Sequence, residues 1–213
     1  MLGTLLKNAV LAVRRLRRND EAVAAVEFAL IVPFLITLYF GSIEAAALFT
    51  VDKRLSSISS TIGDLVAQWD PSDGDLTTGT GGTLTDYLNA STGIMTPYST
   101  TGLKIVVTLV QVKNDKSTKV LWSKANSAGA PKTTGAAYTD LSQTNAPQMN
   151  DAAKGGCVVA AEVTYSYLPM LGQVLKVALN LKHTNYFLPR FGSSAPIDTD
   201  TTTLATDACT NQT

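Results

Sequence analysis

The stretch that decides the fold runs from Phe28 to Ile43 and reads FALIVPFLITLYFGSI. It carries no charge, and residues 22–26 extend it toward the N-terminus with one interruption, at Glu27. A helix needs about 20 such residues to cross the hydrocarbon core of a bilayer. Apolar side chains would surround this helix on every side, which leaves no polar stripe to face water. The stretch therefore predicts a membrane-spanning helix.

A retained span has two alternatives. A helix buried in a soluble core is usually shorter and amphipathic. A cleaved signal peptide has a short apolar core followed by a small-residue cleavage site. Small residues do occur at 45–47, but the apolar stretch is longer than a signal core and residues 44–48 continue it as a strong helix former. We therefore favour the retained span.

Charge is unevenly distributed around this run. Residues 1–21 hold five Lys or Arg residues against two acidic ones, and only Lys53 and Arg54 follow the run closely. The positive-inside rule then places the N-terminus in the cytoplasm and the rest of the chain outside it. We expect a cytoplasmic basic leader at 1–21, a transmembrane helix at 22–50 and an extracytoplasmic α+β domain at 51–213.

The residues after the span have a different pattern. Apolar side chains recur at alternating intervals of three and four, as in an amphipathic helix with one apolar stripe. No Gly or Pro interrupts residues 44–62, so we expect one helix from Ala22 to Trp69, roughly 70 Å long. The sequence DPSDG at 70–74 ends it in a turn. The stripe consists of Leu48, Val51, Leu55, Ile58, Ile62, Leu65 and Trp69.

The stripe has two candidate partners, the sheet of its own domain and the helices of other subunits. A coiled coil is convincing only over three or four heptads, and this stripe has about three. We favour packing on the chain's own domain.

Four later segments alternate with the period of two that is typical of strands, at 103–110, 119–124, 157–167 and 177–187. In hairpin order they would form an antiparallel sheet. We predict an α+β fold, with the long N-terminal helix against a four-stranded antiparallel sheet. Residues 70–101 are predicted as a loop with one helical turn around Leu84–Leu88, and residues 126–156 as a second long loop.

Several classes of function find no support in the sequence. Lys plus Arg and Asp plus Glu both number 17, so the basic excess of a nucleic-acid binder is missing. His183 is the only histidine, which argues against a metal cluster. The sequence has no P-loop, G-x-S-x-G or G-x-G-x-x-G motif. We expect no enzymatic activity, no cofactor, no metal and no nucleic-acid partner.

The two cysteines, Cys157 and Cys209, are spaced unlike a zinc or thiol redox motif. An oxidising compartment outside the cytoplasm favours a disulfide between them. Two unpaired thiols are the alternative. We predict the disulfide, which would tie the Thr-rich C-terminal tail to the start of a strand.

The N-terminal motif carries a family resemblance. Val26-Glu27-Phe28, the proline at Pro33 and Gly41-Ser42-Ile43-Glu44 resemble the N-terminus of TadE-like and TadG-like proteins, minor pseudopilins or assembly proteins of the tight-adherence (Flp) pilus. Residues 163–169, VTYSYLP, and a closing Pro189-Arg190 are similar to later family patterns. The resemblance implies a pilin-like fold, a bacterial inner-membrane location with a periplasmic C-terminal domain, and presence on the pilus or cell surface after processing.

The resemblance also implies a processing site. Prepilin peptidases of this system cut after a glycine placed five residues before the glutamate. Counting back from Glu27 puts the cut between Ala22 and Val23, with Ala22 where the family typically has glycine. Besides the peptidase, the implied partners are the inner membrane, other pilus subunits and assembly-platform proteins.

Glu27 has two interpretations. A carboxylate near the membrane usually has a partner, and a new α-amino group at Val23 would supply one. Alternatively Glu27 stays hydrated at the cytoplasmic headgroups. Glu44 is expected in the outer interface.

Two functions of different classes follow. The first is a minor pseudopilin that acts in pilus biogenesis and surface adhesion through its apolar N-terminal helix. The second is a permanently anchored envelope protein whose outer domain binds a protein or polysaccharide. Removal of the leader distinguishes them, because Arg14 to Arg18 cannot be drawn through lipid cheaply.

Overall fold

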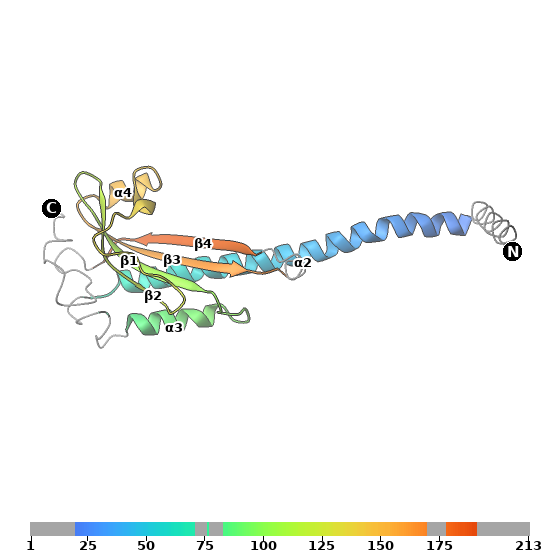
Figure 1. The fold of residues 1–213 in the computed structure, drawn as a ribbon, viewed down its shortest axis with the longest axis horizontal. Coiled ribbons are helices and arrows are strands. Elements are labelled where there is room, and N and C mark those ends of the chain that lie inside the picture. The colour runs from blue at the N-terminus through green and yellow to red at the C-terminus, as the bar shows by residue number, and fades with distance from the viewer. Residues whose placement is uncertain (1–19, 71–75, 77–82, 170–177, 191–213) are drawn as a thin grey trace, which may run out of the picture. The chain divides into compact units, whose positions relative to one another are not determined.

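The computed structural model describes residues 20–70, 76, 83–169 and 178–190 (Figure 1). The chain divides into two compact units, Met1–Ala47 and Leu48–Thr213. The N-terminal unit contributes the first part of helix α2 (Asp20–Ala67). The second unit contributes the end of α2 and the remaining described elements.

Helix α2 confirms the prediction of one continuous helix, since it is unbroken from Asp20 to Ala67, two residues short of the predicted end at Trp69. Most of its predicted stripe is buried by the chain's own domain, as we expected, while Leu48 and Leu65 are partly buried. Val51, Leu55, Ile58 and Ile62 are each 0 % exposed. The apolar spacing of three and four places these side chains on one side of the helix, where they leave water together.

The sheet of the second unit contains four antiparallel strands, which confirms the predicted fold class. β1 pairs with β2, and β3 pairs with β4, as neighbours in the chain should. The expectation that every strand pairs with the next one in the chain is wrong, because β3 pairs with β1 and not with β2. The strand order is β2-β1-β3-β4. β1 and β3 are buried on both faces, so they occupy the centre of the sheet. The strands are β1 (Lys104–Val112), β2 (Thr118–Ala125), β3 (Cys157–Tyr167) and β4 (Leu179–Phe187).

Helix α2 covers one face of this sheet. The Ser59 hydroxyl donates a hydrogen bond of 2.7 Å to the carbonyl of Ala161 on β3. A Cβ added at Gly63 would collide with the ring of Phe187 and lie 3.2 Å from the Cβ of Ala161. The glycine therefore lets the helix approach β3 and β4 closely.

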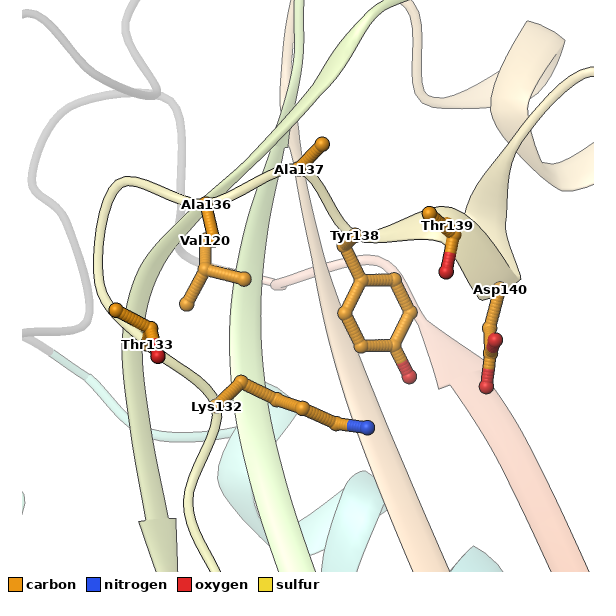
Figure 2. A pocket seen from close by; sticks show the side chains of 8 residues that line it. All are labelled: Val120, Lys132, Thr133, Ala136, Ala137, Tyr138, Thr139 and Asp140. Atoms are coloured by element: carbon orange, nitrogen blue, oxygen red, sulfur yellow. The ribbon is translucent and has the colours of Figure 1, made fainter.

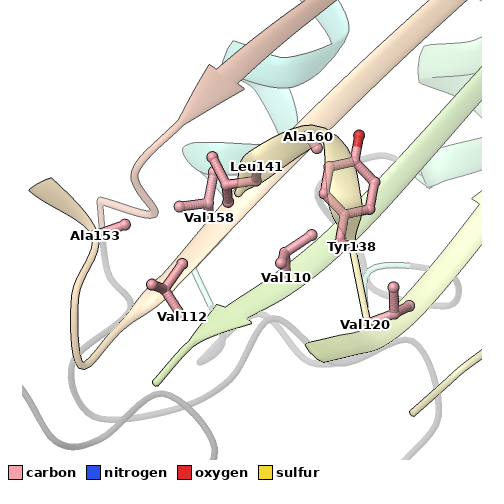
Figure 3. Close-up of a cluster of buried hydrophobic side chains, with 8 residues drawn as sticks. All are labelled: Val110, Val112, Val120, Tyr138, Leu141, Ala153, Val158 and Ala160. Atoms are coloured by element: carbon pink, nitrogen blue, oxygen red, sulfur yellow. The ribbon is translucent and has the colours of Figure 1, made fainter. Parts of the chain in front are cut away.

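The connection between β2 and β3 covers the other face. Tyr138, Leu141 and Ala153 pack from this connection onto alternate residues of the strands (Figure 3). The sequence predicted a loop over 126–156, whereas the structure also has a 3-10 turn η2 (Thr139–Leu141) and a helix α4 (Pro147–Ala152). The strand residues of this second core are Val110, Val112, Val120, Val158 and Ala160.

Helix α3 (Leu84–Ile94) is longer than the single turn predicted around 84–88. A capping box starts it, because the Thr83 hydroxyl accepts from the backbone of Asp86 and the Asp86 carboxylate accepts from the backbone of Thr83. The buried residues of this helix, Leu84, Leu88 and Ser91, lie on one side of it. Arg54 of α2 donates to the carbonyls of Ile94 and Thr96 at 2.5 Å each, just where the helix ends.

Candidate functional site: the exposed half of the long helix

The first half of α2 is the most unusual surface among the described residues. The segment Val23–Ala67 contains a window with a mean hydropathy of 2.2, none of which is buried within the protein. Phe28 and Leu30 are 68 % and 75 % exposed, and Phe34 is 66 % exposed. Soluble monomers rarely leave so large an apolar surface in water. This helix is long and apolar enough to cross a membrane.

Two hydroxyl side chains of this segment are compatible with a lipid environment. The Thr37 hydroxyl donates to the carbonyl of Pro33 at 2.8 Å, and the Ser42 hydroxyl donates to the carbonyl of Tyr39 at 2.8 Å. Both hydroxyls thus donate their hydrogen bonds to backbone carbonyls of the same helix, as hydroxyl side chains of membrane helices do. The helix runs through Pro33, which lies inside α2.

The motif residues named from the sequence lie along this one segment and do not converge on a pocket. Ala22 and Val23 fall in its first turn, and the side chain of Val23 is 49 % exposed. Glu27 is exposed, as is Phe28. Gly41 has open space around the position of a Cβ, whereas Glu44 is partly buried. The cleavage between Ala22 and Val23 and the roles of these residues stay predictions.

The later motifs have structural explanations in the second unit. Val163, Tyr165 and Tyr167 are at most 9 % exposed and share the face of β3 on which Ala161 lies. Arg190 ends the described chain against α2, where its backbone N–H donates to the carbonyl of Ala67 at 2.8 Å. These residues therefore hold the second unit together.

Cys157 begins β3 and is 3 % exposed. Cys209 lies outside the described residues. The disulfide predicted between them accordingly stays a prediction.

A charged cluster that the sequence did not predict lies on the sheet face opposite α2. Glu162 of β3 is 6 % exposed. Its Oε1 accepts a hydrogen bond of 2.7 Å from the Tyr138 hydroxyl and lies 3.2 Å from the Nζ of Lys132. Its Oε2 lies 3.5 Å from the Nζ of Lys182, which also lies 2.8 Å from Asp140. We call Tyr138, Glu162, Lys132, Lys182 and Asp140 the Glu162 cluster.

The cluster has clear electrostatic consequences. Burial, together with the hydrogen bond and the negative charge of Glu162, raises the pKa of Tyr138 far above its ordinary value. The hydrogen bond to Asp140 raises the pKa of Lys182. Tyr138 therefore remains a neutral donor at physiological pH, and Glu162 is surrounded by donors. In sequence, Glu162 is the one charge in an otherwise uncharged strand, which was the signal that could have drawn attention to it.

A shallow pocket adjoins this cluster (Figure 2). Lys132 extends beneath the ring of Tyr138, with its Nζ 5.7 Å from the ring centroid. The polar groups of Lys132 and Tyr138 both contact Glu162. Among the described residues, no group of three or more His, Cys, Asp or Glu side chains is placed to hold a metal ion. The remaining lining residues are Val120, Thr133, Ala136, Ala137, Thr139 and Asp140.

The only histidine of the chain, His183, links β4 to α2. Its Nε2 lies 2.7 Å from the Oδ1 of Asp52. The sequence placed His183 on a strand, and the structure confirms this, but its partner lies 131 positions away in the chain. It serves as a polar contact between two elements of the second unit.

Comparison with known proteins gives a match that lies within the long helix α2. Residues 22–61 match the family model described as TadE-like protein. The chain carries a TadE-like segment. No curated protein and no solved structure matches the chain.

The TadE-like match confirms the family resemblance inferred from the motif residues. It begins at Ala22 and ends within the amphipathic half of α2. It therefore includes the exposed apolar segment and the start of the buried stripe. The match supports a role in tight-adherence pilus systems.

Proposed function

We propose that this chain is a minor pseudopilin of a tight-adherence pilus, held in the bacterial inner membrane by α2 with its second unit in the periplasm. The observation that carries the proposal is the exposed apolar helix surface within the TadE-like match. An apolar helix of this kind can lie in lipid before assembly and against the helices of other subunits afterwards. The described domain then stays available to other pilus subunits and to assembly-platform proteins.

Processing is the step that separates a filament subunit from a fixed anchor. The basic residues before Asp20 would keep the N-terminus on the cytoplasmic side, because charged side chains cross lipid at high cost. Cleavage between Ala22 and Val23 removes all of them. The mature chain then begins with an α-amino group four residues before Glu27, which supplies a cation for that carboxylate.

Intact mass and N-terminal sequencing of the full chain test the proposal, in membranes from cells with and without the prepilin peptidase. We expect a start at Val23 that requires the peptidase. Ala22→Gly should be cleaved at least as completely, and Ala22→Leu should block cleavage. The matched change Ala29→Leu, beyond Glu27, should leave cleavage intact. An unprocessed start in both strains would contradict the pseudopilin.

A permanently anchored envelope protein is the second candidate. Ala22, in place of the glycine typical of the family, favours it. In this case the outer domain would bind a protein or polysaccharide partner while the basic leader remains in the cytoplasm. We propose neither function as enzymatic, in line with the structural role that the TadE-like match suggests.

A further inference from the structure

The four-stranded sheet of the second unit ends in two edge strands, β2 and β4, which lie on opposite sides of it (Figure 1). The outward N–H and C=O groups of an edge strand have no ladder partner, so such an edge can pair with another chain. Proteins usually protect an edge with a bulge, a proline, charged residues or a covering segment. The protection of β2 and of β4 therefore indicates which of them can bind a partner.

The outer edge of β2 is covered by the connection that follows it. The backbone N–H of Val120 donates to the carbonyl of Ala136 at 2.8 Å, and the N–H of Gly135 donates to the carbonyl of Val120 at 2.8 Å. Nearer the end of β2, the N–H of Lys132 donates to the Ser123 hydroxyl at 2.9 Å. The register between β1 and β2 also shifts once, as at a bulge. These features make β2 poorly suited to pairing with a further strand.

Two backbone hydrogen bonds of β1 show to which neighbour its residues bond. The N–H of Asn126 donates to the carbonyl of Ile105, so odd-numbered residues of β1 bond toward β2. The N–H of Val112 donates to the carbonyl of Gly156, just before β3, so even-numbered residues of β1 bond toward β3. In an antiparallel sheet a residue directs its N–H and C=O to the same neighbour, and the direction alternates along the strand.

The pairing register carries this alternation across the sheet to β4. Even-numbered residues of β1 pair with even-numbered residues of β3, so the odd-numbered residues of β3 bond toward β4. These pair in turn with the odd-numbered residues of β4. The even-numbered residues of β4 therefore direct their N–H and C=O groups away from the sheet. They are Asn180, Lys182, Thr184 and Tyr186.

The outer edge of β4 lacks the protection that β2 has. All nine residues of β4 pair with β3 in an unbroken register, without a bulge. The strand contains no proline, and its one Lys, Lys182, is drawn onto the sheet face by Asp140 and Glu162. Within the described ranges, no backbone group bonds to the outward-directed residues of β4. The strand thus presents a regular length of unpaired backbone.

We propose that the outer edge of β4 pairs with an extended segment of another pilus subunit, which adds to the sheet as a fifth strand. The inference rests on the proposed function, which supplies the neighbouring subunits. N–H and C=O groups that recur at every second residue, about 7 Å apart, match the backbone of another extended peptide. Lipids and polysaccharides do not carry donors and acceptors with that alternation.

The side chains of β4 indicate which kind of segment fits. His183 and Asn185 contact α2, so the odd-numbered residues of β4 lie on the α2 side of the sheet and the even-numbered residues on the other side. Side chains of neighbouring strands contact each other on the same face. We therefore expect a segment that alternates apolar residues on the α2 side with polar residues on the other. The apolar residues of β4 on the α2 side are Leu179, Leu181 and Phe187.

Photocross-linking in cells that assemble the pilus tests the edge. p-Benzoylphenylalanine would replace Asn180 in the full chain, and mass spectrometry would identify the cross-linked peptides. We expect a cross-link to another pilus subunit. Thr184→Pro removes an outward N–H and leaves the bonds to β3 in place, so the cross-link should fall at least about ten-fold. Thr184→Val keeps that N–H and should retain the cross-link.

Matched positions complete the experiment. p-Benzoylphenylalanine in place of Lys119, which is exposed on β2, should give no cross-link that Thr184→Pro removes. Urea unfolding in detergent shows whether Thr184→Pro is folded. If it is not, the reciprocal pair replaces it, with the photoreactive residue at position 184 and with Asn180→Pro at the exposed start of β4.

The outcomes separate this inference from the proposed function. A cross-link from position 180 to residues 191–213 of the same chain would overturn the inference, as would equal yields in Thr184→Pro and Thr184→Val. If the chain begins at Val23 and no cross-link to a pilus subunit forms, the edge is not an interface and the proposed function stands. An unprocessed chain in cells that have the peptidase would contradict the proposed function, and this inference with it.

Discussion

Glu162 shows how a single residue shapes the second unit. A buried carboxylate is costly unless hydrogen bonds and positive charge compensate for its lost hydration. Tyr138 supplies the hydrogen bond, and Lys132 and Lys182 supply the charge. The cluster thereby fixes the connection between β2 and β3 to the sheet face, because Lys132 and Tyr138 both belong to that connection.

Replacing Tyr138 with phenylalanine should destabilise the fold and change its response to alkali. Glu162 loses a buried donor, which should lower the free energy of unfolding at pH 7 by about 1–3 kcal/mol. The pKa values of Tyr138 and Lys182 are raised above 10.0 and 10.5. The folded state thus keeps protons that the unfolded state releases, so stability is full below about pH 10 and falls above it.

The measurement is urea unfolding of the full chain in detergent at several pH values from about 7 to about 11. Wild type should lose stability across the alkaline part of this range, and Tyr138→Phe should lose less of it. Tyr39→Phe, at a tyrosine that is 63 % exposed in the first part of α2, is the matched control and should behave as wild type. An unchanged alkaline slope in Tyr138→Phe would show that the cluster does not set the pH response.

At the scale of elements, α2 has one backbone conformation and two kinds of surface. Its first part is apolar on all sides, and its second part buries one stripe against β3 and β4. Leu55 of that stripe is 0 % exposed, whereas Leu35 of the first part is 53 % exposed. The same residue type should therefore contribute differently to folding at the two positions.

Leu55→Ala should lower the free energy of unfolding of the second unit by about 2–5 kcal/mol, because it removes buried methyl groups and leaves a cavity. Leu35→Ala on the same helix should change it little, because Leu35 is 53 % exposed. Urea unfolding in detergent, followed by the fluorescence of Trp69 and Trp122, measures both. Equal losses for the two variants would contradict the division of the helix into two surfaces.

At the scale of the whole molecule, the chain combines a segment suited to lipid with a domain that has its own core. A test of anchoring should therefore introduce charged residues into the uncharged first part of α2. The effect on membrane integration should be compared with that of the same charges on the exposed face of the second half of α2. Leu35 and Leu38 lie in the uncharged run and are more than half exposed. Ser57 and Thr61 are exposed within the second unit.

The double variant Leu35→Arg and Leu38→Arg should abolish stable membrane integration. Two arginines at the centre of a span oppose insertion by about 5–7 kcal/mol. Ser57→Arg with Thr61→Arg should leave integration unchanged. Alkaline carbonate extraction of membranes measures this, and retention of the first double variant in the pellet would argue against a spanning helix.

The sequence by itself determined what depends on local pattern. The uncharged run at 28–43, the stripe that begins at Leu48 and the alternation in four strands predicted the long helix and the antiparallel sheet, because burial imposes periods of 3.6 and 2 on local residues. The TadE-like resemblance was likewise carried by neighbouring residues, from Val26 to Glu44. The capping box at Thr83 was also present in the sequence, but the helix it starts was predicted as only one turn.

Tertiary structure alone decided which distant segments meet. The strand order β2-β1-β3-β4, the contact of Asp52 with His183 and the Glu162 cluster each join residues far apart in the chain. Local periodicity does not encode such pairings, since β2 could pair with β3 by pattern alone. The choice follows from burying β1 and β3 on both faces, where α2 covers one side and the 126–156 connection covers the other.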